Sequence, residues 1–253
     1  NEGRVFMSKL NSTIVQICRE RIGKIAIHAS SSTDSALFAF ATENSSGLIV
    51  ANSYGTIIQK VSSLHIDAIS CACSYKNDFI TGGKDSIVVK WSLNDKQELE
   101  NTKSLMAHAD TVSCVTASQN FGIVVSCSVD GLLVASIAND FSFMMALEME
   151  IEKVAPGSVP LRVMITEMTG RILVHCANPK LRNENSRSDL IFMYTLNGRF
   201  VTQLSLDKSI TAWCQASRKD DCDFLVLADS SNSVYLYDTF NMSLVKKIFI
   251  APA

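Results

Sequence analysis

The side chains best suited to chemistry in this chain are four histidines, eight cysteines and a large number of serines and aspartates. Nucleophilic catalysis requires a Ser or Cys within hydrogen-bond reach of a base that a third group orients. A zinc site usually requires cysteines separated by about two to four residues. The sequence contains no Gly-x-Ser-x-Gly elbow, no Cys-x-x-Cys pair and no phosphate-binding glycine loop. We therefore expect neither an enzyme nor a bound metal or cofactor.

Two of the histidines begin copies of one motif. His65-Ile-Asp-Ala-Ile-Ser-Cys71 and His108-Ala-Asp-Thr-Val-Ser-Cys114 share the pattern His-x-Asp-x-(Ile/Val)-Ser-Cys, and the two histidines are 43 residues apart. Self-similarity at a period of about 20 to 50 residues is typical of repeat architectures. We therefore interpret these histidines as structural residues of a repeat. His28 and His175 lie in apolar runs typical of strands, and we expect them to be core or rim histidines.

A second marker has the same period. An apolar strand, a polar turn and another apolar strand recur, most clearly in Ile80–Trp91, Val125–Ser136 and Val226–Tyr237. The first residues of the second strands are Val5, Leu48, Ile87, Leu132, Leu190 and Val234, at intervals of 43, 39, 45, 58 and 44 residues. Only the interval of 58 departs clearly from the roughly 40 to 45 residues of a four-stranded propeller blade.

With these two markers the chain resembles the WD-repeat family. The resemblance implies an all-β fold, a β-propeller of four-stranded antiparallel blades, with about five and a half blades visible in one domain of 253 residues and a complete ring of seven. The implied divisions are a partial blade at 1–20, then blades at 21–64, 65–107, 108–153, 154–208 and 209–253.

The resemblance also implies a buried, hydrogen-bonded set in each blade. It consists of a His before the first strand, a Ser or Thr on the second, an Asp in the turn and a Trp on the third. In the blade at 65–107 the matching residues are His65, Thr81, Asp85 and Trp91. In the blade at 108–153 they are His108, Ser126 and Asp130, with Ser136 in the place of the Trp.

A narrower resemblance suggests a function. Segments 36–91, 108–137 and 190–204 are similar in order and spacing to the C-terminal propeller of BEACH-domain proteins. That resemblance implies a non-enzymatic scaffold that binds other proteins through its propeller faces, in vesicle or lysosomal membrane trafficking. Two alternatives stay open: another WD-repeat adaptor, such as a coat subunit or a ubiquitin-ligase receptor, and a propeller enzyme with its site at the central channel.

The longest repeat interval contains a candidate binding loop. Residues 178–188 are polar, and the loop carries three basic side chains, Lys180, Arg182 and Arg187. Because binding residues concentrate on loops held by a rigid scaffold, these three could meet an acidic partner or a phospholipid head group. A solvated insertion without a partner is the alternative.

An acidic strand is expected at the end of the blade at 108–153. In Leu147-Glu-Met-Glu-Ile-Glu152 the apolar residues alternate with glutamates, which is typical of an outer strand with one wet face. A docking site for a basic partner is the alternative interpretation of the same glutamates.

Charge and hydropathy exclude two classes of protein. The chain has 23 Lys and Arg against 25 Asp and Glu, so it lacks the basic surplus of a protein that coats nucleic acid. Its longest apolar run, 121–138, is interrupted by Asp130-Gly131, so we expect no transmembrane segment. The first residues show neither an initiator Met nor a signal pattern, which favours an internal piece of a longer chain.

Cysteine placement indicates a location. Most of the cysteines lie in apolar alternating segments, as Cys71, Cys127 and Cys176 do. A chain of this length needs no disulfides for stability, and reduced thiols are typical of the cytosol. We therefore expect a cytoplasmic protein, which could be peripheral on endomembranes through other domains of the full chain.

Overall fold

The computed structural model describes residues 5–8, 14–18, 22–28, 37–42, 46–52, 54, 56–62, 64–94, 96, 98–178, 189–218 and 222–250. Within them the chain is almost entirely β-strand, with one short helix, α1 (Ile151–Val154).

The strands form five antiparallel four-stranded sheets, each made from four consecutive strands. The first two sheets contain β3 (Ile22–His28), β4 (Leu37–Thr42), β5 (Leu48–Asn52) and β6 (Ile57–Val61), then β7 (Ile69–Tyr75), β8 (Asp78–Gly83), β9 (Ile87–Leu93) and β10 (Leu99–Met106). The third contains β11 (Val112–Ser118), β12 (Ile123–Ser128), β13 (Leu132–Ile137) and β14 (Phe143–Glu148). The fourth contains β15 (Val159–Ile165), β16 (Arg171–Ala177), β17 (Asp189–Thr195) and β18 (Phe200–Leu206). The fifth contains β19 (Ile210–Arg218), β20 (Cys222–Asp229), β21 (Ser233–Asp238) and β22 (Ser243–Phe249).

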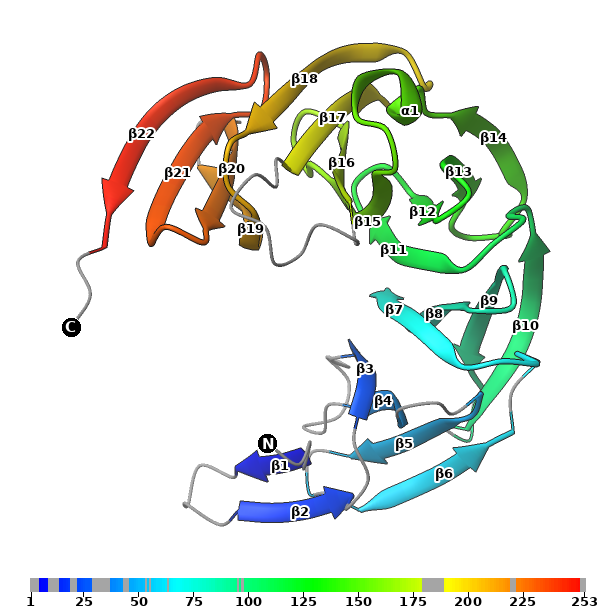
Figure 1. Ribbon diagram of the computed structural model, residues 1–253. Helices are drawn as coiled ribbons and strands as arrows, with labels where there is room; N and C mark the ends of the chain where they lie inside the picture. Colours follow the sequence, from blue (N-terminus) through cyan, green and yellow to red (C-terminus); the bar gives the residue numbers. More distant parts are fainter. Residues whose placement is uncertain are drawn as a thin grey trace.

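The sheets follow one another around an open arc in a propeller-like arrangement (Figure 1). The first strand of each sheet, such as β7 or β11, lies toward the centre, and the fourth, such as β10 or β14, lies at the circumference. A separate two-stranded sheet, β1 (Val5–Ser8) paired with β2 (Ile14–Cys18), lies at the N-terminal end of the arc. The arc remains open between this pair and β22 (Figure 1).

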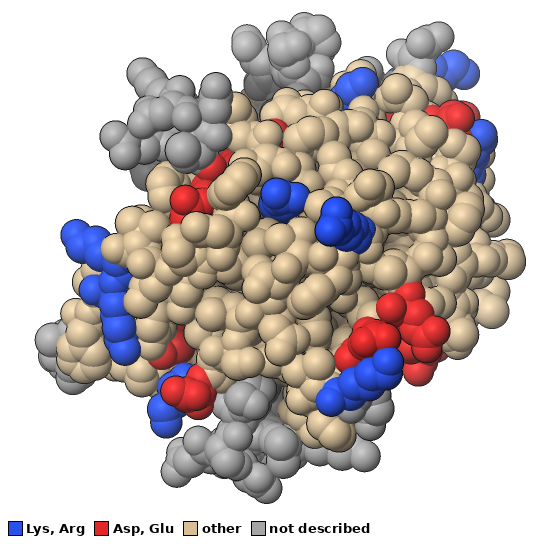
Figure 2. Space-filling view, turned by 90° about the horizontal axis from the view of Figure 1, so that it is seen from above, with Lys and Arg blue, Asp and Glu red and all other residues tan. Residues whose placement is uncertain are grey.

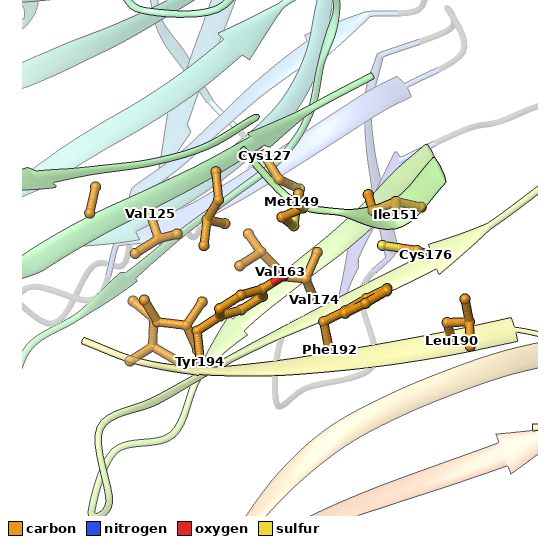
Figure 3. Close-up of a cluster of buried hydrophobic side chains, with 14 of the residues drawn as sticks. Val125, Cys127, Met149, Ile151, Val163, Val174, Cys176, Leu190, Phe192 and Tyr194 are labelled. Carbon is orange, nitrogen blue, oxygen red and sulfur yellow. The ribbon is translucent and has the colours of Figure 1, made fainter. Parts of the chain in front are cut away.

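Apolar side chains fill the space between neighbouring four-stranded sheets. Four clusters of buried residues are present, and each joins one sheet to the next. In the cluster between β11–β14 and β15–β18, Val125 and Cys127 lie opposite Phe192 and Tyr194 (Figure 3). Because such a sheet is covered on both faces, every residue of its second strand β12 is buried. The burial explains why the inner strands are apolar with little alternation.

The last sheet is covered on one face only. Leu225 and Leu227 on β20 are buried against the preceding sheet, whereas Val226 and Ala228, which point to the opposite face, are partly exposed. Strand β22 is exposed along its whole length. The final sheet therefore shows the alternation that the inner sheets lack.

The prediction that the acidic strand extends to Glu152 is wrong, because β14 ends at Glu148. Strand β13 begins at Leu132, which is the partner of Glu148, so a longer β14 would have nothing to pair with. The chain instead turns into α1, and Lys153 bonds to Glu150 at 2.6 Å, one helical turn away. The apolar residues of the segment nevertheless face the interior, because Met149 and Ile151 are buried.

Candidate interaction surface

The structure brings His65, Thr81, Asp85 and Trp91 together inside the β7–β10 sheet. Thr81 Oγ1 lies 2.9 Å from both Trp91 Nε1 and His65 Nε2. His65 Nδ1 lies 3.0 Å from Asp85 Oδ1. His65, Thr81 and Trp91 are buried, and so is the side chain of Asp85.

The direction of each hydrogen bond in this set follows from the donors. An indole nitrogen can only donate, so Thr81 accepts from Trp91 and gives its own hydroxyl hydrogen to His65 Nε2. The remaining ring hydrogen of His65 is then on Nδ1 and is donated to Asp85. Within this set of four side chains, every polar atom from the indole nitrogen of Trp91 to the carboxylate of Asp85 has a hydrogen-bond partner, as a buried polar network requires.

Asp85 connects this network to the surface. Its carboxylate accepts the backbone N–H of Ile66 at 2.9 Å and that of Ile87 at 3.2 Å. Gly83 leaves the necessary room, because a Cβ there would overlap the Asp85 carboxylate and the His65 ring. The connection before β7 and the turn after β8 are thereby held to each other. The sequence motif did not single out Gly83, although its place beside the Asp turn was visible.

The β11–β14 sheet holds an incomplete copy. His108 Nε2 bonds to Ser126 at 2.8 Å, but Nδ1 lies 3.8 Å from Asp130 and has no hydrogen-bond partner among the described residues. Asp130 instead accepts the backbone N–H groups of Ala109 and Leu132. Burial lowers the pKa of His108, and the nearby Asp130 offsets part of that shift. The imidazole is therefore neutral near pH 7.

Between the fourth and fifth sheets, a buried histidine and aspartate form a different hydrogen-bonded pair. His175 Nε2 bonds to Asp189 Oδ2 at 2.9 Å, and both side chains are buried. The same carboxylate oxygen accepts the backbone N–H of Ile210, the first residue of β19. The expectation that His175 is a core or rim histidine is confirmed by its burial. Its partner Asp189 was missed because no repeat motif marks it. The side chain of His28 lies outside the described residues, as do the loop residues Lys180, Arg182 and Arg187.

These networks support an edge where apolar side chains are exposed. In an antiparallel sheet, the end of the second strand, the start of the third, the end of the fourth and the connection to the next sheet all lie at the same edge. Four apolar side chains on the second and third sheets project there: Leu64, Ile66, Met106 and Val129. Ile66 is 88% exposed and Met106 is 78% exposed. We call these four residues the loop-edge patch.

The described side chains include buried thiols but no cluster of metal ligands. No three His, Cys, Asp or Glu side chains come together as a metal site in the part of the chain that the structure describes. Cys127 and Cys176 are buried thiols, and burial is the main cause that raises the pKa of each. They are therefore protonated and unreactive. Among the described residues, no helix is long and apolar enough to cross a bilayer.

Comparison with known proteins supports the fold alone. No family model matches the sequence. The chain is similar in structure to the computationally designed protein Ika8, with a TM-score of 0.64 over 98% of this chain and 72% of that one. The two sequences are 14% identical, so the likeness concerns the arrangement of the sheets and says nothing of function.

Proposed function

We propose that this chain is a WD-repeat propeller that acts as a non-enzymatic protein-interaction scaffold. The proposal is carried by the loop-edge patch, in which Ile66 and Met106 are highly exposed on connections held by aspartates. The backbone N–H of Ile66 bonds to the buried carboxylate of Asp85, and that of Ala109, three residues after Met106, bonds to Asp130. Apolar side chains presented on rigid loops are suited to protein binding, because little entropy is lost when a partner covers them.

The propeller is proposed to belong to a BEACH-type protein of vesicle or lysosomal trafficking. This part rests on the sequence resemblance of 36–91, 108–137 and 190–204. Under it the complete ring has seven blades, the protein is cytoplasmic, and other domains of the full chain bring it to endomembranes. Lys180, Arg182 and Arg187 remain candidates for a second contact with an acidic partner.

Photo-crosslinking in cells tests the proposal. The full-length protein is made with benzoylphenylalanine in place of Ile66 or of Met106, and the crosslinked products are identified by mass spectrometry. Both positions are expected to capture the same protein, and a trafficking component is the expected identity. A coat subunit or a ubiquitin-ligase subunit would instead favour the adaptor alternative.

Phe143 provides the matched control. It is 56% exposed, but it begins β14 at the opposite edge of its sheet. The same replacement at Phe143 is expected to give no adduct with the protein captured at Ile66. Equal capture from all three positions, or none from Ile66 and Met106, would overturn the assignment of binding to the loop-edge patch.

A further inference from the structure

A pocket of about 460 Å³ lies between the outer strands of the third and fourth sheets. Its volume is within the range of roughly 300 to 1,000 Å³ that is usual for ligand sites. Phe192 and Tyr194 on β17, Phe200 on β18 and Val154 on α1 form its apolar lining, and Glu148 and Glu150 supply acidic groups. We call it the outer pocket.

The aromatic lining of the outer pocket is organised before any ligand arrives. Phe192 and Tyr194 are almost completely buried, and their ring centroids are 6.5 Å apart. The ring of Phe200 meets that of Tyr194 edge-on at 5.8 Å. Phe200 is nevertheless 51% exposed and Val154 is 44% exposed. Apolar surface is therefore available to a ligand on a support that packing already holds rigid.

The junction at this pocket differs from the others in the described chain. Between β14 and β15 the connection contains α1, whereas the described parts of the connections before β7, β11 and β19 contain no helix. The helix is anchored by Ile151, which is buried in the cluster between the sheets (Figure 3). Val154 and Glu150 belong to this extra helical segment, so the repeated four-strand pattern does not explain why they are present.

The charge of the outer pocket has one sign. Of the described residues that line it, two are acidic and none is basic. Glu150 is partly balanced by Lys153 at 2.6 Å, while Glu148 has no cationic partner among the described residues. Figure 2 shows this outer side of the molecule, where a compact group of acidic side chains lies beside a basic one and most of the other atoms are uncharged.

We propose that the outer pocket binds a partner's peptide segment in which a large apolar side chain lies next to Arg or Lys. The apolar side chain would cover Phe200 and Val154, and the cation would meet Glu148. Neither element suffices alone, since an exposed ion pair contributes only about 0 to 1 kcal/mol. The site is separate from the loop-edge patch and does not depend on the proposed role in trafficking.

Fluorescence polarisation with defined peptides tests the site in the purified full chain. The probe is fluorescein-labelled Gly-Ser-Arg-Phe-Arg-Ser-Gly. Two comparison peptides replace the Phe by Ala, or both Arg by Glu. The probe is expected to bind roughly tenfold more tightly than the Ala peptide, which lacks the apolar contact. It is expected to bind at least about threefold more tightly than the Glu peptide, in which like charges replace an exposed ion pair worth up to about 1 kcal/mol.

Two protein variants locate the binding. Val154→Asp should weaken binding of the probe by roughly tenfold or more, because it places a carboxylate on the apolar wall. Glu148→Lys should weaken it by about threefold or more, as expected for the loss of an exposed ion pair, and should restore binding of the peptide with two Glu residues. Such a reversal with the charges exchanged cannot come from general loss of structure.

Matched controls are available elsewhere on the surface. Val245 on β22 is 54% exposed, and Glu98 is an exposed glutamate that immediately precedes β10. Neither lines the outer pocket, so Val245→Asp and Glu98→Lys should bind the probe as wild type does. The proposal is overturned if the probe does not bind, if Val154→Asp binds it unchanged, or if the two control variants weaken binding as much as the pocket variants.

Discussion

The indole nitrogen of Trp91 lies 2.9 Å from the hydroxyl oxygen of Thr81, at the buried end of a chain of hydrogen bonds that reaches Asp85 near the surface. The contact joins the middle strands β8 and β9, and it lets a fully buried tryptophan satisfy its only polar atom. Packing and polar satisfaction thus depend on the same side chain.

Replacement of Trp91 by Phe should destabilise the protein strongly. The variant leaves a cavity and takes from Thr81 its indole donor, so we expect a loss of about 2 to 4 kcal/mol in the free energy of unfolding. Urea denaturation measures it. The other tryptophan, Trp213, is only partly buried, and Trp213→Phe should cost about 1 kcal/mol or less. Equal losses in the two variants would contradict the role given to the buried network.

Gly83 should tolerate no side chain. A Cβ there overlaps the Asp85 carboxylate and the His65 ring, so Gly83→Ala should cost about 3 kcal/mol or more and displace His65. Gly131 is the control: it has positive φ but open space around it, and Gly131→Ala should cost only about 1 kcal/mol of backbone strain. Thermal unfolding measures the stabilities, and the His65 ring resonances in NMR spectra report the displacement. Unchanged resonances in the Gly83 variant would contradict the argument.

His108 should make stability depend on pH. Burial lowers its pKa from 6.5 in the folded chain, so below that pH the unfolded chain binds a proton that the folded chain does not. The free energy of unfolding should therefore decrease as the pH falls from about 7 toward 5, by up to about 1.4 kcal/mol per pH unit from this one residue. His108→Gln should flatten the pH profile of urea denaturation over that range. A profile that stays equally steep would mean that other groups control it.

The thiols should differ sharply in reactivity. Cys214 is exposed on β19, whereas Cys73, Cys127 and Cys176 have pKa values raised by burial. N-ethylmaleimide at neutral pH should therefore label Cys214 in the folded protein and spare those three until urea is added. Peptide mapping by mass spectrometry resolves each site. Labelling of Cys127 as fast as that of Cys214 would show that the sheets separate readily.

The strand pattern was accessible from sequence because propeller-like sheets repeat their local chemistry. Leu48, Ile87 and Leu132, which set the repeat interval, begin β5, β9 and β13, the third strands of successive sheets. Such positions keep apolar side chains wherever both faces of a sheet are covered. The His65 motif was equally visible, because one hydrogen-bonded arrangement needs the same residue types at the same spacing.

Features that occur once could not be predicted in this way. Val174, which pairs with Phe192, occupies the position in its sheet that Ser126, which pairs with Val134, occupies in the third sheet. His175 is the next residue along the strand, so its side chain points to the opposite face of the sheet from the one that Ser126 uses. Nothing in the sequence indicates that Asp189 would meet it there. The outer pocket likewise depends on where β14 ends, and that point is set by pairing with Leu132 rather than by the glutamates themselves.

Because each four-stranded sheet is built from four consecutive strands, the chain can fold one sheet at a time. The strands of one sheet pair with their neighbours in sequence, so the earliest contacts are between nearby residues and the loops to be closed are short. Low contact order of this kind favours rapid formation of each unit. During synthesis a completed sheet could dock on its predecessor before the next emerges from the ribosome, so that assembly proceeds around the arc in the direction of translation.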